Sequence, residues 1–435
     1  MIFMIVSRNL AQLAMHRGLI LLLVVVLRSS PAYADHSIPI EERSRARFAD
    51  GMVLEIQYGR LRIKRGNVDA PLPFPEGISD YKSPVETLKE VRESEDHSWV
   101  TVEFSDGCGK EERFRLLYTA LAARIENAAA MGAYHKKDYS SAISGFSRAL
   151  KQDPTFDMAA TNLASAYVRS GKIQEALRAL APLVVRNPAQ LYFKCLTDSD
   201  LSSLLESPEI SGLRSVKPGN ARLDLDRVAG GGQKFSGERY VVYSSARGLV
   251  GAIRFRVDTR DQSDEPICPW ESSLAVTTVD GRNLAEFPLV TMRETADNKS
   301  CGQPTPLKGS VRQSVESRVL TINRMLAALG FVVPEQQEAQ VVPPIPNTLA
   351  GDSERKFPGS SLKLTGSLNG PVKLLEGDSL LDSLAWAENI SWAVYVPSIR
   401  VIVFQWGQHY SEGCPKNVWS GVKTFRIADL PHDSH

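Results

Sequence analysis

The chain has 435 residues, of which 43% are hydrophobic and 23% charged, and its formal net charge is +1. This composition is typical of a folded soluble protein and excludes the disordered and integral membrane classes. The length exceeds one ordinary hydrophobic core, so about two to four domains are expected. A charge balance this close to neutral argues against nucleic acid or an anionic membrane as the main partner.

The N-terminus has the three parts of a secretory signal peptide. Arg8 and Arg17 give a positive first part, Leu19 to Leu27 are apolar, and Ala32-Tyr33-Ala34 form a small-residue cleavage site. The apolar run is shorter than the roughly 20 residues of a membrane span, so cleavage is favoured over an uncleaved anchor. We therefore expect residues 1–34 to be removed, leaving a periplasmic or secreted protein that starts at Asp35 and has no membrane segment.

The five cysteines are interpreted in the light of that export. In an oxidising compartment, cysteines are disulfide candidates before they are metal ligands. No CxxC motif or Cys/His cluster is present, so we predict no metal site and no cofactor. Cys268 and Cys301 are the candidate disulfide, worth about 3 kcal/mol if unstrained. Because five is odd, at least one cysteine is free or pairs between chains, and Cys195 is the expected buried thiol.

Residues 35–118 are predicted to be a polar leader followed by a small β domain. The leader, residues 35–49, is expected to be mobile. Residues 52–58 and 60–64 alternate apolar and polar side chains around a glycine, which indicates a β-hairpin, and residues 98–104 form a further strand. The proline-rich segment 67–84 is expected to be a loop.

One face of the hairpin is basic, with Arg60, Arg62 and Lys64 on alternate positions. Such a face is suited to gripping a polyanion. A solvated strand face is the preferred interpretation, because the total charge is close to neutral.

From Thr119 onward the hydrophobic period becomes that of a helix. Two helical hairpins of the same pattern follow, with expected helices at 121–134, 139–151, 157–169 and 173–186. The second helix of each hairpin stops before a proline, at Pro154 and Pro188, because a residue that precedes proline is pushed out of the α region. Alanines recur where the antiparallel helices would approach most closely, at positions 130, 142, 164 and 176.

These residues resemble the tetratricopeptide repeat, a helical hairpin that recurs along the chain at a fixed period. The second copy carries the likeness best, in Ala160-Thr-Asn-Leu-Ala-Ser-Ala-Tyr167, Gly171, Ala176, Leu180 and Pro188. The first copy matches at Tyr139, Ala142, Phe146, Ala149 and Pro154. The likeness covers roughly 70 residues. The layout of leader, β segment, two repeats and β-rich C-terminus is also similar to uncharacterised exported repeat proteins of Gram-negative bacteria.

The resemblance implies a groove that binds a protein or peptide, lined by the first helix of each hairpin. Carried over by position, its residues are Asn127, Met131, Tyr134, Met158, Thr161, Asn162, Ser165, Val168 and Arg169. Asn127 and Asn162 would bond a peptide backbone and Arg169 a carboxylate, although the full basic set of a carboxylate clamp is missing. The alternative, held equally open, is that these residues pack against the protein's own β domains.

A third repeat fails, because Asp198 stands where Ala130 and Ala164 stood. We therefore expect residues 191–213 to cap the hairpins, with residues 119–216 as the helical domain. Two repeats and a cap are marginal for a free-standing solenoid, so the hairpins are expected to lean on the flanking β domains.

The remaining chain is predicted to be β-rich and sandwich-like, which makes the whole a multidomain α+β protein. Its expected parts are a linker at 217–237, a domain at 238–333, a second linker at 334–360 and a last domain at 361–435. Strands are expected at 239–244, 249–257, 274–279, 287–291, 391–396, 400–406 and 422–427, with a helix at 311–329. A faint duplication relates Val242-Tyr243, a turn and Arg247 to Val394-Tyr395, a turn and Arg400.

No catalytic motif stands out, since HExxH, GxSxG and EF-hand patterns are all missing. The favoured function is therefore an exported, non-enzymatic scaffold or adaptor that mediates protein–protein interaction. The alternative is a cell-envelope glycan-binding protein or hydrolase acting through the C-terminal region. For a hydrolase the candidate acids are Asp261, Asp264, Glu265, Glu271 and Glu412, but no spacing among them singles out an acid/base pair. For a bound sugar or aromatic ligand the candidates are Trp406, His409 and Trp419.

Overall fold

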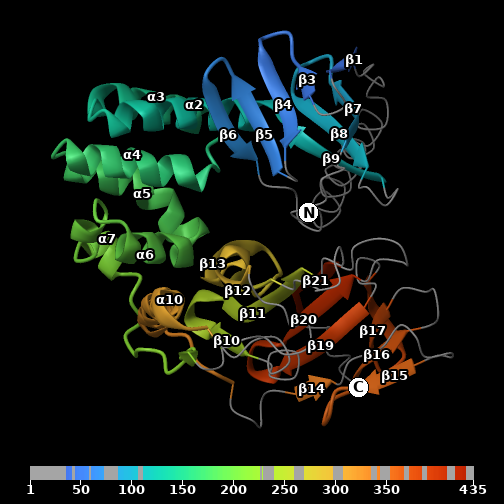
Figure 1. The fold of residues 1–435 in the computed structure, drawn as a ribbon. Helices are drawn as coiled ribbons and strands as arrows, with labels where there is room; N and C mark the ends of the chain where they lie inside the picture. Colours follow the sequence, from blue (N-terminus) through green and yellow to red (C-terminus); the bar gives the residue numbers. More distant parts are fainter. Residues whose placement is uncertain are drawn as a thin grey trace, which may run out of the picture. The chain divides into compact units, whose positions relative to one another are not determined.

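The computed structural model describes residues 36–41, 45–57, 60–72, 87–105, 111–225, 228, 240–258, 269–296, 307–334, 340–342, 353–366, 372–384, 389–408 and 417–427 (Figure 1). The chain divides into two compact units, one of residues 1–73 and 80–125, the other of residues 74–79 and 126–435. The boundary between residues 125 and 126 falls inside helix α2 (Tyr118–His135). Helical hairpins between antiparallel sheets confirm the α+β fold.

The first unit is built on two antiparallel sheets, of strand order β1-β7-β8-β9 and β2-β3-β4-β5-β6. The strands are β1 (His36–Ser37), β2 (Ile40–Glu41), β3 (Arg45–Arg47), β4 (Met52–Gln57), β5 (Arg60–Arg65), β6 (Val68–Leu72), β7 (Thr87–Glu93), β8 (Trp99–Ser105) and β9 (Glu111–Leu117). Strands β4 and β5 form the predicted hairpin, with Gln57 opposite Arg60. Leu54, Leu61 and Ile63 are buried between the alternating polar residues.

Two predictions for this unit are wrong. The expected mobile leader contains β1, β2 and β3, and Ile38, Ala46 and Phe48 are buried. Strand β6 lies in the expected proline-rich loop, where Ala70 and Leu72 are also buried. Strand β6 ends its sheet, and an edge strand tolerates a proline because one of its sides needs no ladder hydrogen bonds.

In the second unit, the end of α2 with α3 (Tyr139–Gln152), and α4 (Asp157–Arg169) with α5 (Ile173–Arg186), form the two predicted hairpins. The ends of α4 and α5 are those expected from the sequence. The four alanines at positions 130, 142, 164 and 176 are at most 4% exposed, so they are buried as expected, and Ala130 lies at a close helix crossing. Gly145 has the same role, because a Cβ atom there would lie 2.7 Å from the Cβ of Ala130.

A third hairpin begins but is cut short. Helix α6 (Pro188–Thr197) ends after ten residues, and Asp198 is its C-cap. A 3-10 turn, η1 (Ser202–Leu204), and the short helix α7 (Pro208–Ser211) complete the predicted cap. Leu201, Leu204 and Ile210 from these segments are fully or almost fully buried.

The β-rich part contains β10 (Val241–Ser244), η2 (Ser245–Arg247), β11 (Leu249–Asp258), β12 (Trp270–Thr278), β13 (Asn283–Val290), η3 (Met292–Thr295), α10 (Gly309–Ala328), β14 (Gln340–Val342), β15 (Ser353–Lys356), β16 (Leu362–Gly366), β17 (Val372–Glu376), β18 (Ser379–Leu384), β19 (Asn389–Val396), η4 (Pro397–Ile399), β20 (Val401–Gln408) and β21 (Asn417–Arg426). One sheet has the order β13-β12-β11-β21-β20-β19-β14, with β10 also on β11, and a second runs β15-β16-β17-β18.

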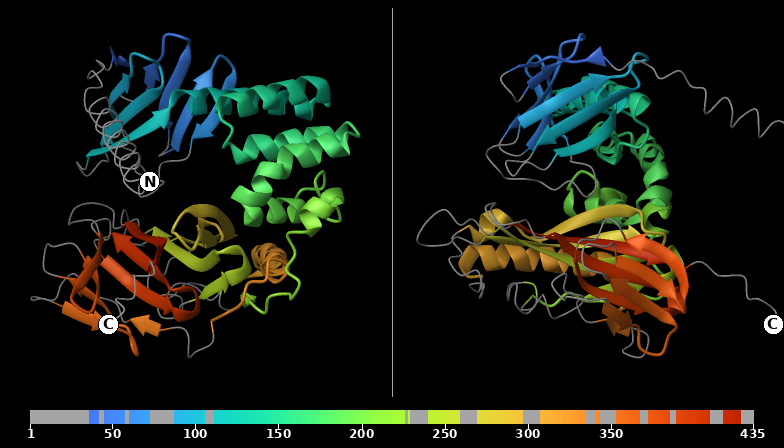
Figure 2. Two further views of the ribbon diagram at one scale, coloured as in Figure 1. Left: turned by 180° about the vertical axis from the view of Figure 1, so that it is seen from behind. Right: turned by 90° about the vertical axis from the view of Figure 1, so that its right-hand side faces the viewer.

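These strands pack in layers, which Figure 2 shows from two further sides. One face of β10–β13 shares a core with α6 and α10, through residues such as Leu274 and Ile322. The opposite face of β10 and β11 packs on Trp392 and its neighbours in β19 and β20. The other face of β19 and β20 packs on β16 and β17, as Phe404 and Leu374 show. The C-terminal part is therefore sandwich-like, as predicted.

The faint duplication is present as a repeated structure. The segments β10-η2-β11 and β19-η4-β20 each join antiparallel strands through four residues, with Ser244 opposite Leu249 and Val396 opposite Val401. Each connection ends in a left-handed residue, Gly248 with φ 60° and Arg400 with φ 50°. Arg400 thus corresponds to Gly248, which corrects by one position the expected match with Arg247.

The two predicted linkers contain ordered structure. In the first, the backbone N–H of Leu223 donates to Oδ1 of Asn323 on α10 at 2.7 Å, and Asn323 Nδ2 donates back to Leu223 O at 3.0 Å. Ala221 and Leu223 are buried. The second contains β14 and β15. The partners of Leu223 and β14 lie far along the chain, at Asn323 and β19, whereas β15 pairs with the neighbouring β16.

Candidate partner-binding site

The expected groove residues, here called the inner-face residues, lie on two neighbouring helices of the second unit. Asn127, Met131 and Tyr134 are on α2, and Met158, Thr161, Asn162, Ser165, Val168 and Arg169 are on α4. These side chains differ in their exposure to solvent. Met158 is 56% exposed and the Arg169 side chain 51%, whereas Asn127, Thr161 and Ser165 are at most 6% exposed. The helical repeat thus presents only part of this face to solvent.

The two asparagines bond to each other. Nδ2 of Asn162 donates to Oδ1 of Asn127 at 2.9 Å, joining α4 to α2. Thr161 is also used locally, since its hydroxyl donates to the carbonyl oxygen of Met158 at 2.9 Å. The hydrogen-bonding groups expected to meet a peptide backbone therefore already brace the two helices.

Tyr134 and Arg169 converge on one carboxylate that the sequence did not place with them. The Tyr134 hydroxyl donates to Oδ2 of Asp200, and the Arg169 guanidinium forms an ion pair with Oδ1 of the same residue. Burial, and then the hydrogen bond to Asp200, raises the pKa of the Tyr134 phenol, so it remains a donor at neutral pH. Arg169 thus pairs with a carboxylate of its own chain, whereas the resemblance implied one from a bound peptide.

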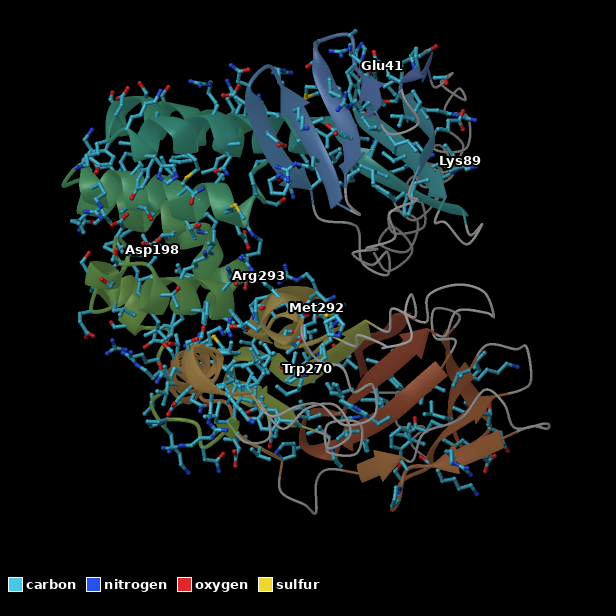
Figure 3. All side chains as sticks on the ribbon, viewed as in Figure 1. Glu41, Lys89, Asp198, Trp270, Met292 and Arg293 are labelled. Atoms are coloured by element: carbon cyan, nitrogen blue, oxygen red, sulfur yellow. The ribbon has the colours of Figure 1, made fainter. Side chains whose placement is uncertain are left out.

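Asp198 reaches the same face from the end of α6, and Figure 3 labels its side chain. Ser165 Oγ donates to Oδ2 of Asp198 at 3.4 Å. The contacts of Ser165, Tyr134 and Arg169 therefore go to the turn after α6. The sequence signal for this arrangement was Asp198, at the position where a third repeat would have alanine. It predicted that the third repeat fails, but not that the following turn would contact Ser165, Tyr134 and Arg169.

Aromatic packing fixes the position of Tyr134, which binds Asp200. The ring of Tyr134 lies 5.6 Å from that of Tyr139 and 6.5 Å from that of Phe146, measured between centroids. Met131 is half-buried against the same cluster, which includes Ala130 and Phe146. These contacts hold the hydroxyl of Tyr134 toward the inner face.

The helical repeats are continuous with the β-rich part of the unit. One hydrophobic core runs from Ala160 and Leu180 in the hairpins, through Tyr192 on α6, to Leu274 and Phe331. The rings of Phe193 and Phe287 lie 4.7 Å apart. The hairpins therefore lean on β10–β13, as the shortness of the repeat array led us to expect.

Two basic side chains of the hairpin face in the first unit, those of Arg62 and Lys64, form ion pairs. Lys64 Nζ lies 2.6 Å from Glu55 Oε2, and Arg62 lies 2.7 Å from Asp69 Oδ2. Glu55 is only 3% exposed, and Arg45 approaches it at 3.5 Å. These ion pairs favour the solvated strand face over a polyanion site.

Cys195 is a free thiol on α6 and is fully buried. Burial, followed by the nearby charge of Asp198, raises the pKa of this thiol to about 12. A thiol so rarely ionised is a poor nucleophile. The candidate disulfide pair, Cys268 and Cys301, lies outside the described residues.

The described part of the chain offers few alternatives to this site. Within it, no group of three or more His, Cys, Asp or Glu side chains is arranged to hold a metal ion. None of its helices is long and apolar enough to span a bilayer. Of the acids considered for a hydrolase, only Glu271 lies in the described ranges, whereas Asp261, Asp264, Glu265 and Glu412 lie outside them.

Comparison with known families agrees with this geometry. Residues 133–194 match the family model of the tetratricopeptide repeat. The chain therefore contains tetratricopeptide repeats, a class of helical module whose stacked hairpins form binding surfaces for proteins. Searches of curated proteins and of solved structures gave no match.

Proposed function

We propose that this protein is an exported, non-enzymatic scaffold that binds a protein or peptide through its tetratricopeptide repeats. The observation that carries the proposal is the repeat pair at residues 133–194, a module that serves protein–protein interaction. On its inner face, Met158 is exposed and offers an apolar contact, and the Arg169 side chain is 51% exposed although its guanidinium is paired with Asp200. Methionine adapts to partners of varied shape, and arginine supplies directed hydrogen bonds.

The scaffold role follows from the shared core. Because the hairpins, α6, α10 and β10–β13 bury one continuous set of apolar side chains, a partner held by the repeats is held rigidly against the β-rich part. A module on a flexible linker would not fix its partner in this way. Among the residues that the structure describes, no observation favours the competing glycan-binding or hydrolase function.

Binding is tested by two matched surface substitutions in affinity capture from the native host. Met158→Glu puts a charge on the inner face, and Val185→Glu does the same on α5, where the valine is 84% exposed. Both positions are exposed, so neither change disturbs packing. We expect Met158→Glu to lose partners that the wild type and Val185→Glu both recover. Equal recovery by all three proteins would place binding elsewhere.

Export is tested separately. The protein purified from the periplasm or culture medium is expected to have a mass that corresponds to a chain starting at Asp35. A full-length mass in the cytoplasmic fraction would contradict export without affecting the binding proposal.

A further inference from the structure

The turn after α6 is anchored at both of its ends. Asp198 caps α6, and its Oδ1 accepts a hydrogen bond from the backbone N–H of Asp200 at 2.9 Å. Leu201, the next residue, is completely buried in the core of the unit. The turn of residues 198–201 therefore has a fixed conformation that presents the Asp200 side chain toward the hairpins.

Both carboxylate oxygens of Asp200 are engaged, by donors from two different repeats. Tyr134 of the first hairpin binds one oxygen and Arg169 of the second binds the other. The Asp200 side chain is 12% exposed, whereas that of Arg169 is 51% exposed. A guanidinium and a hydroxyl converging on the two oxygens of one carboxylate form a charge-assisted anion site.

From these contacts we infer that Asp200 is an internal ligand, which occupies a carboxylate site of Tyr134 and Arg169 and keeps it closed to partners. This inference rests on the proposed binding function and names one class of partner group for it, an acidic side chain of a peptide. A partner carboxylate replaces Asp200 at Tyr134 and Arg169 only when the turn of residues 198–201 is displaced.

Competition with a tethered group is severe. A group held on a short connection competes at an effective concentration of about millimolar. A free peptide that makes only the same contacts would therefore have to reach similar concentrations to replace Asp200. A productive partner must make additional contacts, and the exposed Met158 on the same helix as Arg169 offers one.

The test removes the internal ligand and supplies it as a separate molecule. The probe is an acetylated, amidated, fluorescently labelled peptide with the sequence Thr-Asp-Ser-Asp-Leu-Ser of residues 197–202. We expect the Asp200→Ala protein to bind this probe at least tenfold more tightly than the wild type, measured by fluorescence anisotropy. Adding Arg169→Gln to Asp200→Ala is expected to abolish the gain.

Two controls separate site opening from unfolding. Glu206→Gln removes a neighbouring acid that pairs with Arg214 and is 79% exposed, and it should leave probe binding at the wild-type level. Arg169→Gln alone should increase deuterium exchange at residues 198–204, as Asp200→Ala does, without gaining affinity for the probe. Equal probe binding by the wild type and Asp200→Ala, or a gain that survives Arg169→Gln, would overturn the inference.

These outcomes are independent of the natural partner. If Met158→Glu and the wild type recover the same proteins but Asp200→Ala still binds the probe, the proposed partner surface fails and the internal ligand stands. If partners are lost with Met158→Glu but the probe never binds, the internal ligand fails and the proposed function stands.

Discussion

The side chain of Asn187 donates from Nδ2 to the carbonyl oxygen of Leu284, 97 residues later in the chain, at 2.8 Å. The same nitrogen donates to Asp157 Oδ2 at 3.0 Å, and Asn187 Oδ1 accepts from the backbone N–H of Gln190 at 3.3 Å. Asn187 is 5% exposed. One buried amide thus joins the start of α4, the start of α6 and strand β13, where the repeats meet the sheet.

Replacing Asn187 by alanine should therefore weaken this junction. The substitution removes an N-cap, worth about 1 kcal/mol, and leaves the Leu284 carbonyl without its buried donor, at about 1–2 kcal/mol more. We expect the free energy of unfolding in urea to fall by about 2–3 kcal/mol. The matched control is Asp153→Ala, at the equivalent position of the preceding repeat, where the carboxylate accepts bonds from Thr155 in its own turn. If Asn187→Ala lowers the free energy of unfolding no more than Asp153→Ala does, Asn187 does not stabilise the junction between the repeats and the sheet.

Two helical glycines should respond differently to substitution by alanine. At Gly145 a Cβ atom would lie 2.7 Å from Ala130 Cβ, whereas at Gly132 no atom lies within 4 Å. Alanine gains about 1 kcal/mol of helix propensity at either site, but overpacking a close helix crossing costs about 1–3 kcal/mol. Thermal unfolding should show Gly132→Ala stabilised and Gly145→Ala neutral or destabilised. Stabilisation of both variants would mean that the crossing can widen at little cost.

The turn between β12 and β13 holds the two halves of the duplicated sheet together. Gly281 has φ +90°, and a Cβ atom on it would lie 2.6 Å from the carbonyl oxygen of Thr424 on β21. The hydroxyl of Thr424 in turn donates to the carbonyl oxygen of Thr278 at 3.0 Å. Gly281→Ala therefore carries both a left-handed backbone penalty of about 1–2 kcal/mol and a steric one of about 1–3 kcal/mol.

Gly377 provides the comparison for that prediction. It has φ +59° in the turn between β17 and β18, with nothing within 4 Å of its Cβ position, so alanine there incurs the backbone penalty alone. Calorimetric melting should show Gly281→Ala at least about 1 kcal/mol less stable than Gly377→Ala. Equal melting shifts would show that the contact with Thr424 relaxes freely.

Glu294 should make stability depend on pH in the acid range. Burial alone would raise the pKa of this carboxyl, but Arg318 at 2.6 Å and the backbone and hydroxyl of Thr291 at 2.9 Å lower it below its ordinary value. A carboxyl with a depressed folded-state pKa stabilises the fold above its unfolded pKa and loses that contribution as the pH falls through the folded one. The wild type should therefore exceed Glu294→Gln in unfolding free energy near pH 7, with the difference shrinking below about pH 4.

The measurement for Glu294 is urea unfolding of both proteins at several pH values, repeated with Arg318→Gln as background. Removing Arg318 should reduce the difference between Glu and Gln at neutral pH, since the ion pair lowers the carboxyl pKa. A difference that does not change with pH would show that the carboxylate and the amide make equivalent contacts.

Local periodicity was enough to determine the helices. Helices α4 and α5 have the predicted ends, and α10 (Gly309–Ala328) agrees with the expected helix at 311–329 to within two residues at each end. A helical hydrophobic period, close-packed alanines and a proline after each hairpin all act within a few residues of the chain. The strands around Asp280-Gly281 were predictable for the same reason, because alternation and a turn define a hairpin locally.

Tertiary structure alone decided the elements whose partners are distant in sequence. Strand β14 pairs with β19, and Asn323 of α10 bonds the backbone at Leu223, so both predicted linkers contain segments ordered by distant parts of the chain. Strand β6, by contrast, pairs with its neighbour β5 and was missed because of its proline-rich composition. The contacts of the inner-face residues were also beyond prediction from local sequence. The resemblance to the tetratricopeptide repeat implied that Tyr134 and Arg169 face a ligand. The sequence could not show that Asp200 is the group that Tyr134 and Arg169 bind. Asp200 lies in a turn that is separated from α4 by two further helices, and such a contact leaves no periodic pattern in the sequence.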